Sequence, residues 1–432
     1  MRHLVWCAFV LSGSFAAEVT YAELVRMLHR SSVLKEAEML YKAAQHTAQA
    51  AQGKRLPTID ARLQTARLSE TPSIIFHTPQ GATQPLPMGT KTRFEGEIRL
   101  RYPLFTGFAL DASVSKSRLQ ARRAELAKRD AERNVMLQAT ELFGAVRIAN
   151  ARQKALKRAL EALRMSEKKA AAMEKKGLLA PVERYNIRAK RFAIKAQYDA
   201  AVYETRQLKN RLSYFANRDI DTLRGDIRLR ALPSLERLKA LAMRHRSDIQ
   251  ALATLLKIDD KAVATAKSRF YPTVGVEAAL KRQGDSLALN GDGYTNADRS
   301  YVGMEVSWNL FNGQADTHTL EAARYRKLAT AARFDDYRRR VATEIENAYM
   351  RLQALRAAYR SAKMQLRAQK EYYALTKGRF EQRFADADEL SRAIADLAQA
   401  RADLAAAKER LALQRATLWL MSGLESFTRA LR

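Results

Sequence analysis

Four segments of the chain alternate between apolar and polar residues, which is the pattern of a β-strand with two unlike faces. In the clearest segment one face carries Thr92, Phe94, Gly96, Ile98, Leu100, Tyr102 and Leu104. The opposite face of that segment carries Lys91, Arg93, Glu95, Glu97, Arg99 and Arg101. By this criterion we predict strands at residues 58–68, 91–105, 273–283 and 299–311. The residues between the strands of each pair are expected to form surface loops, 69–90 and 284–298.

A period of seven residues replaces the alternation after each pair of strands. On the way out, the apolar positions of the first half are Val135, Leu142, Ala149, Leu156 and Leu163. On the way back they are Ile187, Ile194, Ala201, Leu208 and Phe215. This spacing is typical of antiparallel coiled-coil hairpins, and proline, which costs a helix interior about 3 kcal/mol, is absent after Pro272. We predict helical hairpins over residues 109–215 and 315–421, with turns at 177–181 and 378–388.

The two halves of the chain repeat one another with an offset of 206 residues, set by aligning Gly107 with Gly313. Around these glycines the sequence RYPLFTGF returns as SWNLFNGQ. Each half also opens with a helical segment that ends at a proline, Pro57 or Pro272. Because the boundaries repeat together with the elements, we predict two structural repeats, residues 17–216 and 235–422.

The four predicted strands have the sequence signature of a transmembrane β-barrel, since glycines and charges on the second face suit a water-filled lumen. The alternative is a half-buried hairpin on a soluble domain. Four strands are too few to close a barrel, which needs about eight, so the chain is expected to oligomerise around its pore. Four aromatic residues are predicted to anchor the sheet at one membrane interface: Tyr102, Phe105, Trp308 and Phe311. Gly107 and Gly313 are expected to form the bend where strand passes into helix.

Residues 1–16 have the layout of a secretory signal, with Arg2 and His3 before an apolar core and small residues before Ala17. The segment is too short to span a bilayer. The alternative is a buried apolar N-terminus of a cytosolic chain. The only cysteine, Cys7, lies inside the segment, so the mature chain is expected to be held by packing without disulfides.

The chain is strongly basic, with 76 Lys and Arg against 46 Asp and Glu and a net charge of +30. Such a balance by itself suggests a nucleic acid or an anionic surface as partner. The basic residues are, however, mixed with acidic ones along the predicted helices, which is typical of a solvated helical face. The six histidines are scattered, and no phosphate-binding glycine loop or zinc spacing is present. We therefore expect no enzyme, no metal site, no cofactor and no nucleic acid. A basic coiled-coil scaffold or nucleic-acid-binding protein remains the alternative, although it explains neither the signal nor the strands.

The order of helix, strand pair, long helix, turn and return helix, given twice, resembles the TolC family of outer-membrane efflux proteins. The segments that carry the resemblance are YPTVGVEAAL, WNLFNG and KKGLLAPVERYNIRAKRF. The resemblance implies a mostly α fold: a homotrimer with a twelve-stranded barrel in the outer membrane of a Gram-negative bacterium, a periplasmic helical barrel and an equatorial belt. Residues 217–234 and 423–432 would supply the belt. It implies a passive exit duct of a tripartite efflux or secretion system, with outer-membrane lipids, a periplasmic adaptor (membrane fusion) protein and an inner-membrane transporter as partners.

Within this family the helical turns dock the adaptor. The resemblance assigns docking to Gly177, Leu178, Leu179, Ala180, Arg383, Phe384 and Ala385. The second turn departs from the family pattern, since Arg383 stands where glycine is expected and Phe380 where tyrosine is expected.

Acidic residues near the two turns are predicted to constrict the pore: Glu183, Asp386, Asp388 and Glu389. Glu183 and Glu389 match the family's acidic positions, whereas Arg392 replaces a second acid. Glu183 is expected to tie the first turn to the second. For Asp386 the alternative is a helix cap, because an aspartate before a helix accepts from its free N–H groups.

Overall fold

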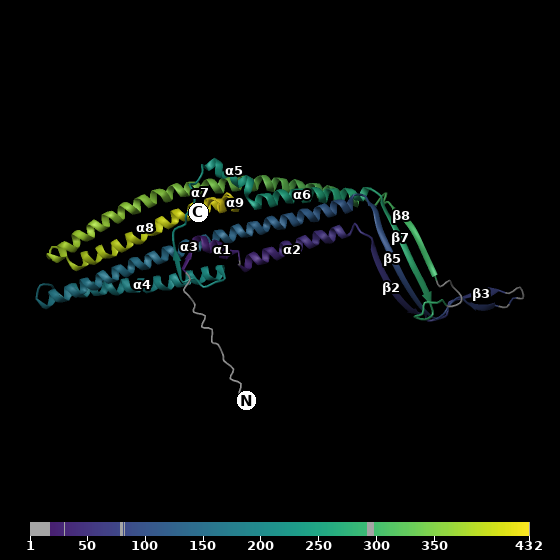
Figure 1. Ribbon diagram of the computed structural model, residues 1–432, viewed down its shortest axis with the longest axis horizontal. Helices are drawn as coiled ribbons and strands as arrows, with labels where there is room; N and C mark the ends of the chain where they lie inside the picture. The colour runs from purple at the N-terminus through teal and green to yellow at the C-terminus, as the bar shows by residue number, and fades with distance from the viewer. Residues whose placement is uncertain (1–17, 30, 78–80, 82, 292–297, 432) are drawn as a thin grey trace, which may run out of the picture. The chain divides into compact units, whose positions relative to one another are not determined.

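The computed structural model describes residues 18–29, 31–77, 81, 83–291 and 298–431, so the predicted signal at residues 1–16 lies outside the described residues. These described residues are mostly helical and form one four-stranded sheet and two smaller ones (Figure 1). The chain divides into two compact units. We call residues 1–39, 126–250 and 336–432 the helical unit, and residues 40–125 and 251–335 the sheet unit.

The sheet unit contains an antiparallel sheet whose strand order is β2-β5-β7-β8. Its strands are β2 (Thr58–Arg67), β5 (Thr92–Thr106), β7 (Thr273–Gly284) and β8 (Asp298–Ser307). The two repeats therefore meet where β5 pairs with β7. Both β2 and β8 are edge strands, and each leaves one row of backbone N–H and C=O groups without a partner in the sheet.

The two faces of this sheet differ as the alternation predicts. Large apolar side chains are exposed on one face: Ile59, Leu63, Ile98, Leu280, Val302, Met304 and Val306. The other face carries ion pairs, among them Arg99 with Glu97 at 2.6 Å and Arg101 with Asp60 at 2.7 Å. An apolar face open to the surroundings suits contact with lipid, and a charged face suits a wet lumen.

Three details of the sheet unit differ from the sequence predictions. β8 ends at Ser307, so the predicted strand 299–311 is too long and Trp308 lies beyond it. The register shifts between Pro103 and Phe105, because a bulge at this point adds a residue that the simple alternation cannot reveal. The predicted loop 69–90 contains a hairpin of β3 (Ser73–His77) and β4 (Thr83–Pro87).

The prolines of that hairpin explain why its strands were not predicted. Pro85 and Pro87 both lie in β4, although prolines at this density indicate a loop. A proline removes an N–H donor, but β4 pairs with β3 alone, so the missing donors can face the free side of the strand.

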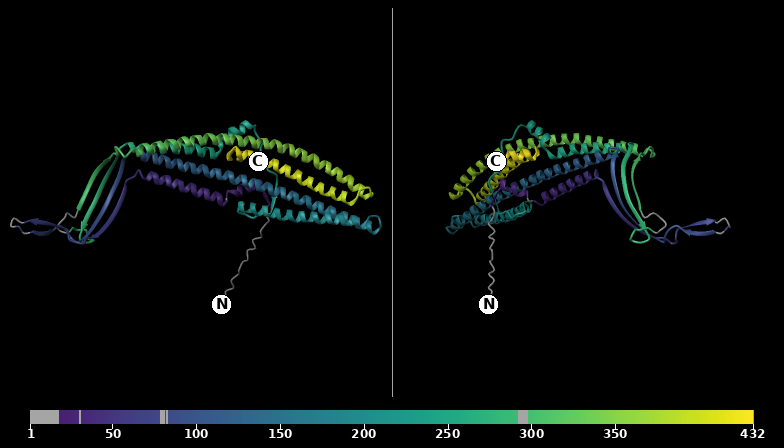
Figure 2. Two further views of the ribbon diagram at one scale, coloured as in Figure 1. Left: turned by 180° about the vertical axis from the view of Figure 1, so that it is seen from behind. Right: turned by 45° about the vertical axis from the view of Figure 1, so that its right-hand side comes forward.

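Two antiparallel hairpins of long helices follow the strands along the chain, and both hairpins can be seen in every view of Figures 1 and 2. They consist of α3 (Ala109–Lys175) with α4 (Pro181–Ala216), and α7 (Ala315–Glu381) with α8 (Ala387–Met421). Heptad positions such as Leu163, Ile187 and Leu390 are at most 2% exposed. The second turn is shorter than the predicted 378–388, because Gly378 stays inside α7, where an isolated glycine is tolerated.

The predicted bends between strand and helix are confirmed. Gly107 and Phe108 have φ of 59° and 70°, and Gly313 and Gln314 have φ of 67° and 65°. At Gly107 a β-carbon would lie 2.6 Å from the carbonyl oxygen of Ser268, so only glycine fits this close approach.

The remaining elements of the helical unit surround an apolar core. They include β1 (Glu18–Thr20), α1 (Tyr21–Leu28), β6 (Thr222–Arg224), α5 (Leu235–His245) and α9 (Leu424–Ala430), while α2 (Ser32–Gly53), α6 (Ser247–Lys267) and a 3-10 turn (Ser268–Phe270) complete the chain. Residues 217–234 and 423–431 meet in this region, where the backbone N–H of Arg230 donates to the carbonyl oxygen of Ala430 at 2.9 Å. Among the described residues, none of the helices has both the length and the apolar composition needed to cross a membrane.

Candidate functional site: the pocket between the two helical turns

The turns that end α3 and α7 have the same backbone geometry. In the first turn Gly177 has a φ of 65°, and the N–H of Leu178 donates to the carbonyl oxygen five residues earlier at 2.9 Å. In the second turn Arg383 has a φ of 68°, and the N–H of Phe384 donates to the carbonyl oxygen five residues earlier at 2.7 Å. This is the hydrogen-bond pattern of a helix that ends in one left-handed residue.

Arg383 therefore occupies a backbone position that favours glycine. A side chain in this conformation costs about 1 to 2 kcal/mol, yet the turn keeps the geometry of its counterpart at Gly177. The second departure, Phe380 in place of tyrosine, is only 2% exposed and packs into the core between the hairpins. Apolar packing holds this position without a hydroxyl group.

The two turns line a pocket of about 490 Å³. The first hairpin contributes Met173, Leu178, Leu179, Ala180 and Glu183. The second hairpin contributes Phe380, Arg383, Phe384, Ala385, Asp386 and Glu389. Of the predicted docking and constriction residues, only Gly177 and Asp388 do not line this pocket. The fold thus brings together residues that lie about 200 positions apart in the sequence.

Glu183 joins the two hairpins. Its Oε2 accepts a hydrogen bond of 2.9 Å from the backbone N–H of Ala387, the first residue of α8. The first N–H groups of a helix have no partner within the helix, so a carboxylate from the other hairpin satisfies one of them and also interacts favourably with the helix dipole.

Each acidic residue of the second turn has its own partner. Asp386 is the N-cap of α8 and accepts from the backbone N–H of Glu389 at 2.6 Å, as the capping alternative predicts. Asp388 forms an ion pair with Arg392, and Glu389 accepts from Arg379 at 2.9 Å. The negative charge of the turn is therefore largely neutralised locally, and Arg383 takes no part in it.

Arg379 was missed by the sequence analysis. Besides contacting Glu389, it donates to the carbonyl oxygen of Phe384 at 2.9 Å, and so joins the end of α7 to the start of α8. The two residues of the ion pair lie ten positions apart across a turn, and neither the helical nor the heptad period predicts such a contact.

A second contact between the hairpins lies one helical turn from the pocket. Lys169 of α3 and Glu381 of α7 form an ion pair of 3.0 Å. The hydrogen bond from Lys169 lowers the pKa of Glu381 below its usual value. Both side chains are more than 40% exposed, so this pair contributes little to stability by itself.

Apolar side chains are exposed beside the pocket. Leu178 is 38% exposed and Phe384 is 71% exposed. Leu179 and Ala385, in contrast, are partly buried against the core between the hairpins. The outward apolar surface of the turns is therefore provided mainly by Leu178 and Phe384.

The predicted interface aromatics lie at the strand ends that lead into the helices. Tyr102 and Phe105 are in β5, and Trp308 donates to the carbonyl of Phe270 at 3.3 Å. Phe311 is 81% exposed. Two aromatics that were not predicted extend this group: Phe105 stacks edge-on against Phe108, which stacks against Tyr271, at 5.1 and 5.6 Å between ring centroids. Phe108 directly follows the predicted bend residue Gly107, and this position is the sequence feature that could have placed it in the aromatic group.

Several solved channel structures have the same fold. The chain superposes on VceC from Vibrio cholerae with a TM-score of 0.76 and 17% identity, over 93% of this chain and 96% of that chain. The CmeC outer membrane channel from Campylobacter jejuni gives a TM-score of 0.78 and 15% identity, over 95% and 86% of the two chains. The open state of the MtrE outer membrane channel from Neisseria gonorrhoeae gives a TM-score of 0.74 and 17% identity, over 93% of this chain and 89% of that chain. No curated protein sequence matches the chain.

Residues 238–424 match the sequence family described as outer membrane efflux protein. This part of the chain carries the sequence pattern of outer membrane efflux proteins, and the whole chain has the fold of the channels described above. Proteins of this TolC-type family are channels in the outer membrane of Gram-negative bacteria, and the fold of this chain implies a trimer. The alternatives of a basic scaffold, a nucleic-acid-binding protein and a soluble hairpin domain are thereby set aside.

Outer membrane efflux proteins are non-enzymatic channels. Within the described residues no cluster of His, Cys, Asp and Glu is arranged to hold a metal ion.

Proposed function

We propose that the chain is the passive outer-membrane duct of a tripartite efflux or secretion system. In this arrangement three copies close a barrel of twelve strands, and an inner-membrane transporter delivers substrates through a periplasmic adaptor protein. Outer-membrane lipids contact the apolar face of the sheet. The observation that carries the proposal is the pocket that both helical turns line, with Leu178 and Phe384 exposed beside it.

The docking step rests on these two side chains. Exposed leucine and phenylalanine at the ends of long helices offer an apolar surface, which contact with an adaptor hairpin would remove from water. The contacts of Glu183 with Ala387 and of Lys169 with Glu381 hold the two hairpins together beside this surface. We infer that adaptor docking loosens these contacts and so opens the periplasmic end of the duct.

Export by whole cells tests the docking surface. A compound whose accumulation rises when the chain is deleted is identified first, and accumulation of that compound is then measured with variants restored to the deletion strain. Leu178→Asp combined with Phe384→Asp is expected to abolish export while the trimer stays at its normal level in the outer membrane.

Tyr203→Asp is the matched control, because Tyr203 is also exposed on a long helix, at 63%, but lies away from the turns. This control is expected to export normally. Full export by the double variant would contradict docking at the turns.

A further inference from the structure

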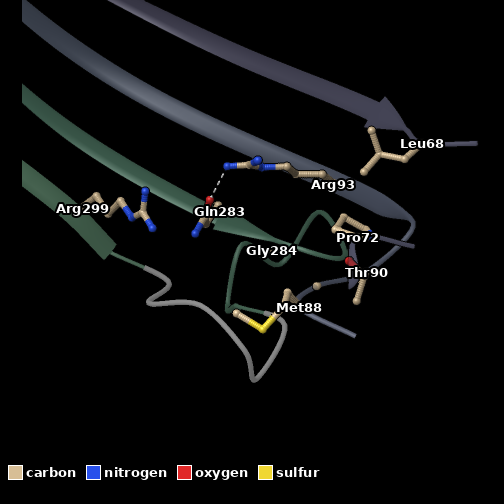
Figure 3. Close-up of a pocket in the computed structure, with 9 residues that line it drawn as sticks. Leu68, Pro72, Met88, Thr90, Arg93, Gln283, Gly284 and Arg299 are labelled. Atoms are coloured by element: carbon tan, nitrogen blue, oxygen red, sulfur yellow. Dashed lines mark hydrogen bonds between the residues drawn. The ribbon is translucent and has the colours of Figure 1, made fainter. Parts of the chain in front are cut away.

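A polar pocket of about 280 Å³ lies at the end of the sheet that is opposite the strand–helix bends. Figure 3 shows residues that line it. Arg93 at the start of β5, Gln283 at the end of β7 and Arg299 at the start of β8 line it. Arg93 donates to Oε1 of Gln283 at 2.8 Å, and Figure 3 shows the two arginines on either side of this glutamine. Gln283 is only 6% exposed, so the side chain that holds Arg93 is itself firmly placed.

The strand register puts these side chains on the charged face of the sheet. Gln283 is paired with Glu95, and Arg299 is paired with Lys281. Directly paired residues point to the same side of a sheet. Ile98 and Val302 point to the opposite, apolar side, so the pocket opens toward the face assigned to the lumen.

Positive charge exceeds negative charge at this end of the lumen face. One row of paired residues across the sheet consists of Arg62, Glu97, Lys281 and Arg299, three cations and one carboxylate. Glu97 is committed to Arg99 at 2.6 Å, and Glu95 pairs with Lys281 and more distantly, at 3.7 Å, with Arg93. Among the residues that the structure describes, Arg299 has no carboxylate within ion-pair distance.

We propose that this pocket binds oxyanions, the phosphate or carboxylate groups of molecules in the lumen. Arg93 and Arg299 contact the anion, and Gln283 positions Arg93. Arginine suits this role because its planar guanidinium presents paired N–H donors that match the oxygens of a carboxylate or phosphate. In a trimer the pocket recurs three times around the pore, and rings of arginine and lysine favour anions in other channels.

The proposal rests on the channel function and deepens it. The acidic residues of the helical turns have local partners, whereas the cations at the far end of the sheet are in excess. The duct would therefore favour anionic cargo at its outer end. Phosphate groups of the surrounding lipid are a second source of the same chemistry, which the experiment distinguishes.

The test uses the detergent-extracted full-length trimer in planar lipid bilayers. Inorganic pyrophosphate is added to either side, and the block of conductance and the anion-to-cation permeability ratio are measured. Wild-type channels are expected to be blocked from the side of the pocket, and the block should weaken at higher salt because exposed charges are screened.

The variant Arg93→Gln with Arg299→Gln is expected to need about tenfold more pyrophosphate for half block and to lose anion preference. Replacement of both arginines by lysine should keep the permeability ratio and weaken only the block. Arg282→Gln is the matched control, since Arg282 precedes Gln283 on the opposite face and pairs with Asp298 at 2.5 Å. This control should behave as wild type.

Two results would overturn the anion pocket and leave the channel function intact. One is that wild-type channels conduct but pyrophosphate does not block them, and the other is that pyrophosphate blocks the glutamine variant equally well. Absence of conductance from every trimer would instead contradict the channel. If pyrophosphate blocks only in bilayers free of lipopolysaccharide, lipid phosphate occupies the pocket. If lipopolysaccharide makes no difference, the pocket serves anions in the lumen.

Discussion

The carboxylate of Glu183 in the first helical hairpin accepts a hydrogen bond of 2.9 Å from the backbone N–H of Ala387 in the second. Near their turns the two hairpins also meet through apolar packing and through the exposed ion pair of Lys169 with Glu381. A charge-assisted hydrogen bond such as that of Glu183 contributes about 1.5 to 3 kcal/mol. It can therefore bias the turns toward contact without fixing them there.

Removal of the contact is expected to open the periplasmic end. Glu183→Ala should raise single-channel conductance in planar bilayers several-fold, because α8 loses a capping partner held by the other hairpin. Glu204→Ala is the control, since Glu204 pairs at 3.8 Å with Arg152 of its own hairpin and is half exposed. Equal conductance in wild type and Glu183→Ala would refute a gating role for this contact.

The acidic residues after the second turn should differ in function. Asp388→Ala combined with Glu389→Ala is expected to raise conductance or to weaken block by divalent cations, because these are the acids that we place at the pore constriction. The change also releases Arg379 and Arg392 from their partners, which makes the constriction more positive.

Asp386→Ala serves as the comparison. Asp386 caps α8, and loss of such a cap costs about 1 kcal/mol of stability. This variant should unfold at lower temperature and keep its divalent-cation block. If the double variant also keeps its conductance and block, these acids act only locally, as caps and ion-pair partners.

A buried charge cluster makes the helical unit sensitive to acid. Burial by itself raises the pKa of Asp248, but the hydrogen bond and charge of Arg246, with the hydroxyl of Tyr337 at 2.8 Å, hold this pKa below its usual value. Arg133 lies 3.4 Å away. A carboxylate with a lowered pKa stabilises the fold above its unfolded-state pKa, and this contribution is lost as the pH falls through the folded-state value.

We therefore expect the contribution of Asp248 to the free energy of unfolding to be constant above about pH 5 and to decrease below about pH 4. Asp248→Ala should cost about 3 kcal/mol at neutral pH, since it leaves Arg246 buried without its partner, and should flatten the acid dependence. Thermal unfolding of the trimer at pH 7 and pH 3 measures both effects. Asp336→Ala, which removes an exposed pair with Arg340, should change the unfolding temperature little.

The two faces of the sheet should tolerate charge unequally. Ile98→Arg places a cation on the apolar face and is expected to cost about 2 to 4 kcal/mol if the residue lies near the middle of the bilayer. Val306→Arg should cost less, because Val306 lies in the same row of the sheet as the predicted interface residue Phe105. Ser307→Arg, at the neighbouring position on the opposite face, should be much milder. The yield of folded trimer in membranes measures the difference, and equal yields would contradict the assignment of the lipid face.

Glu97→Arg, which the sequence suggests as another mild change, is a poor control in the structure. The Glu97 side chain is only 9% exposed and pairs with Arg99, so an arginine there would meet like charge.

The sequence predicts those features in which burial of one face gives the apolar residues a regular spacing along the chain. Alternation near Ile98 and heptads through Leu163 and Ile187 each follow from one face being apolar. The bulge between Pro103 and Phe105 and the left-handed Arg383 could not be predicted in this way, because each depends on the backbone of one residue. The site was predicted in part: the resemblance assigned Glu183 to the link between the turns, but its partner, a backbone N–H, has no sequence signature.

The edge strands β2 and β8 make assembly inseparable from insertion. Within the hydrocarbon of a bilayer each unpaired backbone group costs several kcal/mol, so a lone subunit cannot lower its free energy by entering the membrane. Subunits must meet before or while they insert, and no stable inserted monomer is expected. A chain with a defective β8 would therefore also prevent the intact chains of its trimer from inserting. When half of the chains are defective, about one trimer in eight contains only intact chains.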